Sequence, residues 1–346
     1  MTFAPVSRSR SRLVLVLVGF AVSILFGYLA VRDVRWAEVW DALRTSNYWW
    51  LLPWLALCAV TVFIRAVRWQ MLFAPATRPP LLAITSSLVI GQFFNNVLPA
   101  RAGEAARVVA LRRQTKTSAV EAAGTVVSER VLDGLVLLAL LFVASPFLPA
   151  VGWIEAAAAL AGAGLVCTVV LVIVLARFGS RPFRALARLV GRIPGVRGDS
   201  LEHAADSLVR GFAVFRDPRM AAIAIGLTAA SWLSLSFAFW LGMIGFDMAV
   251  GFGAGLLVVI ATDLALILPS SPAGLGVFEA AAITALSVYA VDDSTALSYA
   301  IVVHAAIFFL FVVLGYVALH WHVVSVRRAS LSAIAPPEAA PSPPRG

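Results

Sequence analysis

A short segment holds three charged residues, Arg101, Glu104 and Arg107, whose spacing suits the binding of a phosphate group. Glu104 and Arg107 are three positions apart, so they lie on one face of a helix. Arginine binds phosphate through a planar fork of N–H donors, which makes Arg101 and Arg107 natural ligands for an anionic headgroup. The alternative is that both arginines only anchor a helix at a membrane surface. Their position next to a Leu98-Pro99 break favours binding.

A second charged group, Glu129, Arg130 and Asp133, opens an apolar run. Glu129 and Asp133 are four residues apart, which places them on one helical face. Charges at the edge of lipid must face protein or water and must be paired. The group could therefore bind a headgroup, relay a proton, or lock its helix to Arg101 or Arg107, and the sequence leaves these roles open.

Two carboxylates, Asp263 and Glu279, lie deeper in apolar sequence. A lone buried carboxylate is costly there unless it is paired or protonated, so both are functional candidates and Glu279 is the stronger one. Arg65 and Arg68 precede Trp69 at the end of another apolar run, where basic and aromatic residues commonly anchor a helix. We expect these two arginines to be anchors first and substrate ligands second.

Motifs of catalytic and metal-binding sites are missing from the sequence. It contains no serine nucleophile elbow, phosphate-binding loop or zinc motif, so neither an enzyme nor a cofactor is expected. His304 has no second histidine or acid at metal-ligand spacing, and Cys58 and Cys167 are the only cysteines. We therefore predict no catalytic residue, no metal site and no disulfide framework.

The elements that must position these residues are predicted to be membrane-spanning helices. Hydrophobic residues make up 61% of the 346 residues and charged residues only 13%, which is far from the composition of soluble proteins. The net charge of +9 is spread between apolar runs rather than concentrated in one basic domain. The charge therefore indicates membrane topology and not a nucleic-acid partner.

Apolar runs of about 20 residues are long enough to cross the hydrocarbon core as helices. Strands cannot span a membrane alone, so the expected fold class is an all-α polytopic membrane protein. About six full spans are predicted, at residues 13–31, 48–64, 131–149, 156–176, 220–241 and 295–321.

Basic residues indicate the orientation of these spans. They precede the first span, follow the second, and follow the last at Arg327 and Arg328, so these positions and both termini belong in the cytoplasm. We expect a multi-pass protein of the cell inner (plasma) membrane. The predicted organisation is a basic N-terminus at 1–12, membrane halves at 13–176 and 220–326 joined by a basic cytoplasmic connection at 177–219, and a disordered proline-rich tail at 327–346.

Two further apolar segments, near 81–113 and 251–291, are interrupted by proline and glycine. The distribution of basic residues makes the first enter from the cytoplasm and the second from outside. We therefore predict two re-entrant or broken helical hairpins in an inverted pseudo-repeat, an arrangement that marks transporter sites near the midplane. The alternative for each break is a tight turn between ordinary spans.

Irregular backbone at membrane depth must be buried in protein or line a wet cavity, because lipid cannot satisfy its hydrogen-bonding groups. The helices that begin near Gly103 and Gly276 would point free N–H groups into such a cavity, which suits a phosphate. The residues predicted to form the breaks and the cavity are Asn95, Asn96, Pro99, Gly103, Pro269, Pro272, Gly274 and Gly276.

The ordered combination of these motifs resembles the membrane domain of the lysylphosphatidylglycerol synthase/flippase family. The resemblance implies a flippase-like fold with internal pseudo-symmetry and re-entrant helices. It covers roughly residues 10–325 and rests on Arg65, Arg68-Trp69, the segment from Asn95-Asn96 through Leu98-Pro99, Arg101 and Gly103-Glu104 to Arg107, Glu129-Arg130 with Asp133, and the segment from Pro269 to Gly276 and Glu279.

The resemblance also implies movement of an anionic or glycosylated lipid, such as a polyprenyl-linked one, between membrane leaflets. In the synthase branch of the family a cytosolic aminoacyl-transferase domain follows the membrane part. A short proline-rich tail follows Arg328 here, so lysyl transfer is not expected from this chain.

Three functions stay open at this point. The preferred one is a lipid translocator, the second is a non-transporting subunit that presents a lipid to a glycosyltransferase or aminoacyltransferase partner, and the third is a membrane enzyme that acts on a lipid phosphate with a metal. The sequence leaves the oligomeric state open. In the translocator, arginines draw the headgroup into a cavity and acids gate it or carry protons; the arginines are Arg101, Arg107 and Arg130, and the acids are Glu104, Glu129, Asp133 and Glu279.

Overall fold

The structure is a computed structural model that describes residues 7–32, 34–98, 102–178, 217–267 and 270–334. Every regular element in these ranges is a helix and none is a strand, which confirms the predicted all-α class. The basic connection predicted at 177–219 lies mostly outside the described residues. The same holds for the end of the predicted tail and the first residues of the N-terminus.

The helices vary widely in length, from single 3-10 turns to 42 residues. The α-helices are α1 (Ser7–Val31), α2 (Trp36–Thr45), α3 (Leu51–Met71), α4 (Leu81–Val97), α5 (Gly103–Gln114), α6 (Ala119–Ala144), α7 (Gly152–Phe178), α10 (Pro218–Gly245), α11 (Phe252–Ala265), α12 (Val277–Ser287) and α13 (Asp293–Ile334). Short 3-10 turns are η1 (Tyr48–Trp50), η2 (Pro75–Thr77), η3 (Ser145–Phe147) and η5 (Pro272–Gly274).

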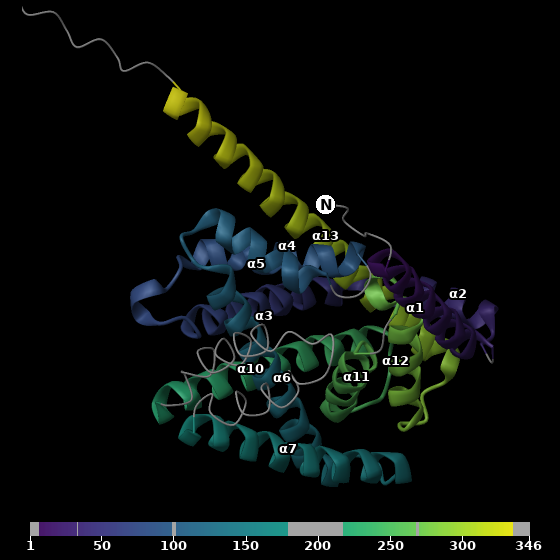
Figure 1. The fold of residues 1–346 in the computed structure, drawn as a ribbon. Helices are drawn as coiled ribbons and strands as arrows, with labels where there is room; N and C mark the ends of the chain where they lie inside the picture. Colours follow the sequence, from purple (N-terminus) through teal and green to yellow (C-terminus); the bar gives the residue numbers. More distant parts are fainter. Residues whose placement is uncertain (1–6, 33, 99–101, 179–216, 268–269, 335–346) are drawn as a thin grey trace, which may run out of the picture.

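The helices pack as neighbours that are often distant in sequence. In Figure 1, α3, α4 and α5 lie above α10, while α7 forms the lower edge and α1, α2 and α12 lie at the right. The most extensive pairing joins α3 to α10, and α4 packs as extensively on α13 as on α5. The α3–α10 and α4–α13 pairings connect the first part of the chain to the second, so the two predicted membrane halves are interlocked.

Four helical segments among the described residues are long and apolar enough to cross a membrane: Tyr48–Met71, Gly152–Val170, Pro218–Gly245 and Asp293–Trp321. A fifth candidate combines Leu17–Val31 with α2 across a bend of 83°. The predicted number of six spans therefore stays a prediction.

The span predicted at 131–149 has different bounds in the structure. The helix α6 begins at Ala119, where the Ser118 hydroxyl accepts a hydrogen bond from the Glu121 N–H, and ends at Ala144 before Pro146. The charged group at Glu129 therefore lies inside the helix and does not open it. A charged residue can occupy this position because other helices supply its partners.

Both predicted hairpins are present as packed helix pairs. The pair α4–α5 corresponds to the segment near 81–113 and the pair α11–α12 to the segment near 251–291. The break residues Pro99, Arg101 and Pro269 lie outside the described residues. The membrane sense of the two hairpins and their inverted relation stay predictions.

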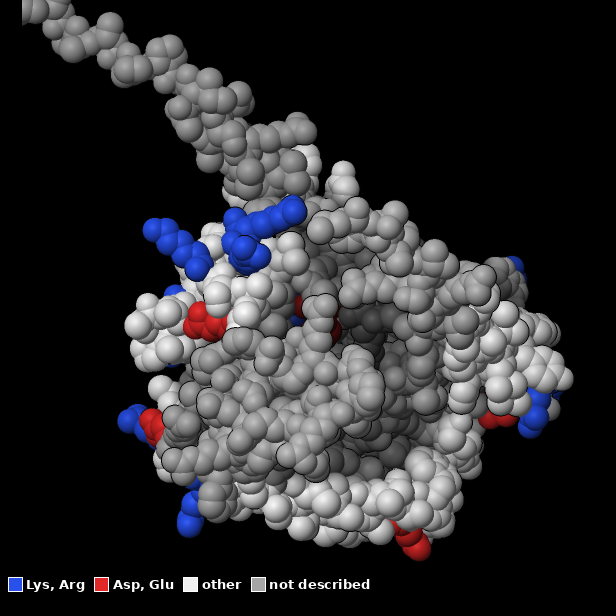
Figure 2. All heavy atoms as spheres, viewed as in Figure 1, with Lys and Arg blue, Asp and Glu red and all other residues white. Residues whose placement is uncertain are grey.

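The C-terminal end of α5 carries the basic residues Arg112 and Arg113 in its last turn. In Figure 2 basic side chains gather at the upper left of the face shown, over the region of α5. These basic residues agree with a basic rim at one membrane surface.

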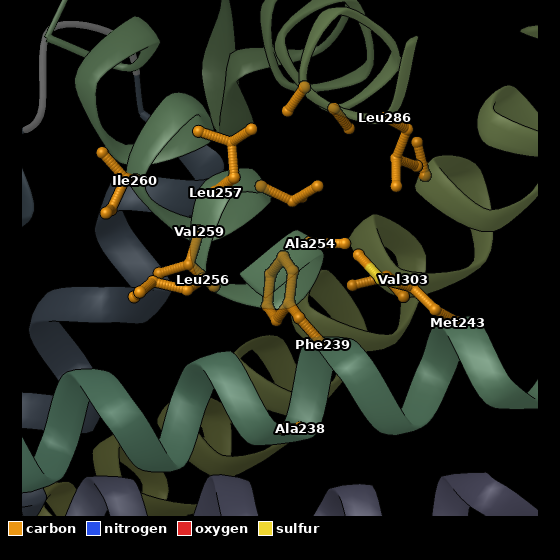
Figure 3. Close-up of a cluster of buried hydrophobic side chains, with 14 of the residues drawn as sticks. Ala238, Phe239, Met243, Ala254, Leu256, Leu257, Val259, Ile260, Leu286 and Val303 are labelled. Atoms are coloured by element: carbon orange, nitrogen blue, oxygen red, sulfur yellow. The ribbon is translucent and has the colours of Figure 1, made fainter. Parts of the chain in front are cut away.

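The larger core cluster lies where α10, α11 and α13 meet (Figure 3). Phe239, Met243, Leu257 and Val303 are all buried there. Lipid is as apolar as these side chains, so close packing rather than removal from water holds such helices together. The small residue Ala254, which is completely buried, allows the close approach of α11.

A second core cluster joins α3, α4, α5 and α6. Trp69, Ile84, Leu111 and Leu132 are completely buried in it. These side chains fix the first helices of the chain relative to one another. Three of these helices carry charged residues singled out in the sequence, so this cluster helps to determine where their side chains meet; the residues are Arg65 and Arg68 on α3, Glu104 and Arg107 on α5, and Glu129, Arg130 and Asp133 on α6.

We expect that replacing Asp217 with alanine lowers the free energy of unfolding by about 1 kcal/mol, because a helix cap is lost. The Asp217 carboxylate accepts hydrogen bonds from the N–H groups of Arg219 and Met220 at the start of α10. Denaturant unfolding in detergent micelles would measure the change. The same substitution at Asp41, an exposed residue within α2, serves as the control and should stay within about 0.5 kcal/mol. Equal losses would contradict the capping role.

Candidate functional site

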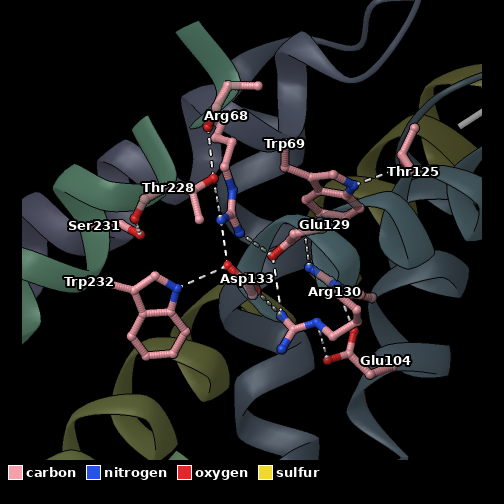
Figure 4. Close-up of polar contacts among 12 residues, drawn as sticks. Arg68, Trp69, Glu104, Thr125, Glu129, Arg130, Asp133, Thr228, Ser231 and Trp232 are labelled. Atoms are coloured by element: carbon pink, nitrogen blue, oxygen red, sulfur yellow. Dashed lines mark hydrogen bonds and ion pairs between the residues drawn. The ribbon is translucent and has the colours of Figure 1, made fainter. Parts of the chain in front are cut away.

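The site begins with Arg68 on α3, whose side chain is completely buried. Its Nη1 donates to Asp133 Oδ1 at 2.5 Å and to Thr228 Oγ1 at 3.0 Å. Its Nη2 donates to Glu129 Oε1 at 2.9 Å. Glu129 and Asp133 lie one turn apart on α6, so both reach the same guanidinium. Arg68 thus joins α3, α6 and α10 (Figure 4).

Arg107 on α5 extends this network. Its Nη1 donates to Glu129 Oε2 at 2.8 Å, and its Nη2 lies 2.6 Å from Glu104 Oε2 in an ion pair. The guanidinium carbon is 4.8 Å from the centre of the Trp69 ring, a cation–π contact. The Trp69 ring is itself held by a hydrogen bond from Nε1 to Thr125 Oγ1. Arg107 is therefore directed at protein partners.

Arg130 completes the network at its more open side, with 41% of its side chain exposed. Its Nη2 lies 3.3 Å from Asp133 Oδ2 and 3.3 Å from Glu129 Oε1, and its Nε lies 3.8 Å from Glu104 Oε1. Arg68, Arg107 and Arg130 thus face three carboxylates, and the formal charges of the six groups cancel. Such pairing is needed to offset the large cost of removing charges from water.

A cavity of about 460 Å³ lies beside this network. Side chains from both hairpins line it, and they include both polar and apolar groups. Its wall therefore offers hydrogen-bonding groups as well as apolar surface to a ligand. The polar residues include Gln92, Asn95, Asn96, Glu104, Arg130 and Asp263, and the apolar residues include Val62, Leu88, Leu235, Phe239, Val259, Phe278 and Phe311.

Arg65 on α3 is the cavity-lining cation whose hydrogen-bonding capacity is not used up. Its Nε and Nη2 are buried and have no hydrogen-bond partner among the described residues. Its guanidinium carbon lies 4.7 Å from the centre of the Trp232 ring, which orients the group. The buried Asn96 Nδ2 on the same wall also lacks a partner within the described part of the chain. Unpaired buried donors cost about 1–3 kcal/mol each, so they mark a place for water or a ligand.

The Gly103 N–H at the start of α5 and the Gly276 N–H that precedes α12 are occupied, so these two groups do not point free into the cavity. The Gly103 N–H donates to Asn95 Oδ1 at 2.9 Å, and the Gly276 N–H donates to Glu279 Oε2 at 2.7 Å. Side-chain caps satisfy both groups because each hairpin places an acceptor near the break. These two N–H groups are therefore not available to an anion in the cavity.

Glu279 is paired, as its depth in apolar sequence requires. Its Oε1 lies 2.6 Å from Nδ1 of His304 on α13, and both side chains are buried. This role of His304 is not visible in the sequence, because the two residues are 25 positions apart and lie on different helices. Among the described residues, no group of three or more His, Cys, Asp or Glu side chains is arranged to hold a metal ion.

The predicted site residues that the structure describes occupy three overlapping places. Arg101, Pro99 and Pro269 lie outside the described residues. The sequence did not indicate Gln92, Thr228 or Trp232, because their partners lie on other helices. The network contains Arg68, Glu104, Arg107, Glu129, Arg130 and Asp133; the cavity wall contains Arg65, Asn95, Asn96 and Gly274; and the α11–α12 turn contains Pro272, Gly274, Gly276 and Glu279.

The fold and this site define a multi-pass α-helical membrane protein with a polar network beside a cavity. The chain belongs to the family described as the lysylphosphatidylglycerol synthase TM region, which matches residues 16–315. This match confirms the family to which the sequence motifs pointed. No curated protein matches the chain.

Proposed function

We propose that this protein binds an anionic or glycosylated lipid, such as a polyprenyl-linked one, and moves its headgroup between the leaflets of the cell inner membrane. The observation that carries the proposal is Arg65, whose unpartnered donors are buried at the wall of an amphiphilic cavity. Membership in the membrane-domain family supports a lipid-related role. Both termini are proposed to lie in the cytoplasm.

In this proposal two arginines position the site and two others bind the headgroup. Arg68 and Arg107 are buried in ion pairs that join α3, α5 and α6, so they position the site. Arg65 has unused donors that match the oxygens of a phosphate, and the half-exposed Arg130 stands beside it on the cavity wall. These two residues replace Arg107 as the leading ligands, while the proposed role of Arg101, which lies outside the described residues, stays a prediction.

The shape of the cavity suits a headgroup better than a whole lipid. Its volume of about 460 Å³ is within the range of small-molecule sites and too small for two long acyl or prenyl chains as well. The apolar wall, which includes Leu235 and Phe311, would contact the first carbons of the tail. The rest of the tail would stay in the surrounding lipid.

The proposal predicts that Arg65→Gln reduces the amount of co-purified anionic lipid about tenfold or more, because charge-assisted hydrogen bonds worth about 1.5–3 kcal/mol are lost. Native mass spectrometry of gently extracted protein would measure lipid retention. Movement of fluorescent phosphatidylglycerol in proteoliposomes would measure translocation. Arg112→Gln is the matched control, since Arg112 is an exposed arginine outside the cavity wall.

Retention of the same lipid by the Arg65→Gln variant would refute the ligand assignment. Selective binding without translocation, together with a co-purified lipid-modifying enzyme, would instead support a subunit that presents lipid to a glycosyltransferase or aminoacyltransferase. In either case we propose that this chain is a binding protein and not itself the enzyme.

A further inference from the structure

The turn between α11 and α12 is held on two sides by different kinds of contact. On one side α1 touches it through backbone, because a Cβ at Gly276 would lie 2.5 Å from the Ser23 carbonyl oxygen. The Ser271 N–H also donates to Ser23 Oγ at 2.8 Å. On the other side, α13 reaches the turn through His304. The second contact depends on an ionisable side chain.

His304 faces two hydrogen-bond acceptors. Its Nδ1 lies 2.6 Å from Glu279 Oε1, and its Nε2 lies 3.1 Å from the carbonyl oxygen of Ala273 in the turn. A neutral imidazole has one N–H and can donate to only one of them. Both hydrogen bonds therefore require one further proton, either on the imidazole beside a carboxylate or on Glu279 beside a neutral imidazole. The two arrangements contain the same number of protons.

Other charged groups near the pair do not take over this role. Asp263 on α11, Arg65 on α3 and Arg130 on α6 line the same cavity as His304. Tyr299, on α13 itself, donates its hydroxyl to the Phe239 carbonyl oxygen. The side chains that α1, α4 and α10 present nearby are uncharged. The Glu279–His304 pair therefore supplies an ionisable contact between α13 and the turn.

The backbone of the turn adds a reason for it to move when that contact is lost. Ala273 has φ of +60°, a conformation that residues with a Cβ seldom adopt, and Gly274 and Gly276 have φ of +77° and +82°. A hydrogen bond from His304 to the Ala273 carbonyl helps to hold this conformation. His304, Ala273 and Gly274 also line the cavity, so movement of the turn would change the cavity wall.

We propose that Glu279 and His304 form a proton-binding site that links the protonation of the pair to the position of the α11–α12 turn. When the proton leaves to water in the cavity, a carboxylate and a neutral imidazole remain, and one of the two hydrogen bonds of His304 is lost. The turn is then released from α13. The claim that this site supplies energy for lipid movement rests on the proposed function. The claim that the site binds a proton does not.

Hydrogen–deuterium exchange of the full-length protein in lipid nanodiscs tests the site directly. After correction for the intrinsic pH dependence of exchange, the peptide at 270–280 should lose protection about tenfold as the pH rises and the pair loses its proton. Loss of the proton at higher pH removes a hydrogen bond, which sets the sign. A flat profile in the wild-type protein would overturn the proposal.

Two variants on the same helix separate the pair from other histidines. His304→Gln keeps a donor for the Ala273 carbonyl but cannot titrate, so the pH-dependent loss of protection at 270–280 should disappear. His320→Gln is the matched control, since His320 is exposed and stacks on Tyr316. In this variant the pH-dependent loss of protection should persist. If the pH-dependent loss of protection persists in His304→Gln, another group is responsible for it and the proposal is refuted.

Transport in proteoliposomes distinguishes this inference from the proposed function. With fluorescent phosphatidylglycerol as the probe, an imposed pH gradient should speed headgroup movement in the wild type and not in His304→Gln. A pH-dependent change in hydrogen–deuterium exchange without any lipid movement would overturn the translocation proposal and support the proton site. Lipid movement with a flat exchange profile would support translocation and overturn the proton site.

Discussion

Replacing Glu129 with alanine is expected to lower the free energy of unfolding by about 3–5 kcal/mol, because it leaves two buried cations underpaired. The Glu129 carboxylate accepts from Arg68 Nη2 at 2.9 Å and from Arg107 Nη1 at 2.8 Å. Its side chain is 2% exposed, so water cannot replace the lost oxygens. Denaturant unfolding in micelles, followed by tryptophan fluorescence, would measure the loss.

A glutamate two turns earlier on α6 gives the control. Glu121 accepts a hydrogen bond from Thr77 Oγ1 at 2.6 Å on the open surface, so Glu121→Ala should cost less than about 1 kcal/mol. If Glu129→Ala unfolds at the same denaturant concentration as the wild type, the network does not hold α3, α5 and α6 together. Comparable losses in both variants would point to helix propensity instead of buried charge.

Replacing Gly103 with alanine is expected to open the α4–α5 hairpin, at a cost of about 1–3 kcal/mol or more. The new Cβ would collide with the Gly91 carbonyl oxygen and with the side chain of Asn95, both on α4. A backbone oxygen cannot rotate away, so the helices must separate and the hydrogen bond from the Gly103 N–H to Asn95 is lost. Arg107, four residues further along α5, would shift with the helix.

The control is Gly134→Ala in α6, where an added Cβ meets no atom within 4 Å. Alanine favours a helix over glycine by about 0.5–1 kcal/mol, so this variant should be unchanged or slightly more stable. Denaturant unfolding would compare the two, and lipid retention would report the shift of Arg107. Equal stability of the two variants would show that the approach of α4 to α5 is looser than the structure indicates.

The family and much of the fold were predictable from local sequence. Long apolar runs identified the helical class, and the pairing of acids with arginines followed from the cost of isolated charge in lipid. The four-residue spacing of Glu129 and Asp133 correctly placed both on one face of α6. Breaks with proline and glycine indicated both hairpins.

The roles of individual arginines were less predictable, because all arginine side chains have the same chemistry. The sequence favoured Arg107 as a ligand and Arg68 as an anchor, yet both are buried in ion pairs. Arg65 differs from Arg68 by less than one helical turn, and only the neighbouring helices decide which of the two meets carboxylates. Its unpartnered donors thus became visible only in three dimensions.

The sequence by itself determined an all-helical membrane protein of this family with two interrupted helix pairs and paired charges, since hydropathy and spacing are local properties. The tertiary structure decided which charges cancel, which cation lines the cavity, and that His304 meets Glu279 and Ala273. The physical reason is that burial and hydrogen-bond partners depend on helices distant in sequence, and a repeat of 3.6 residues per turn carries no information about those neighbours.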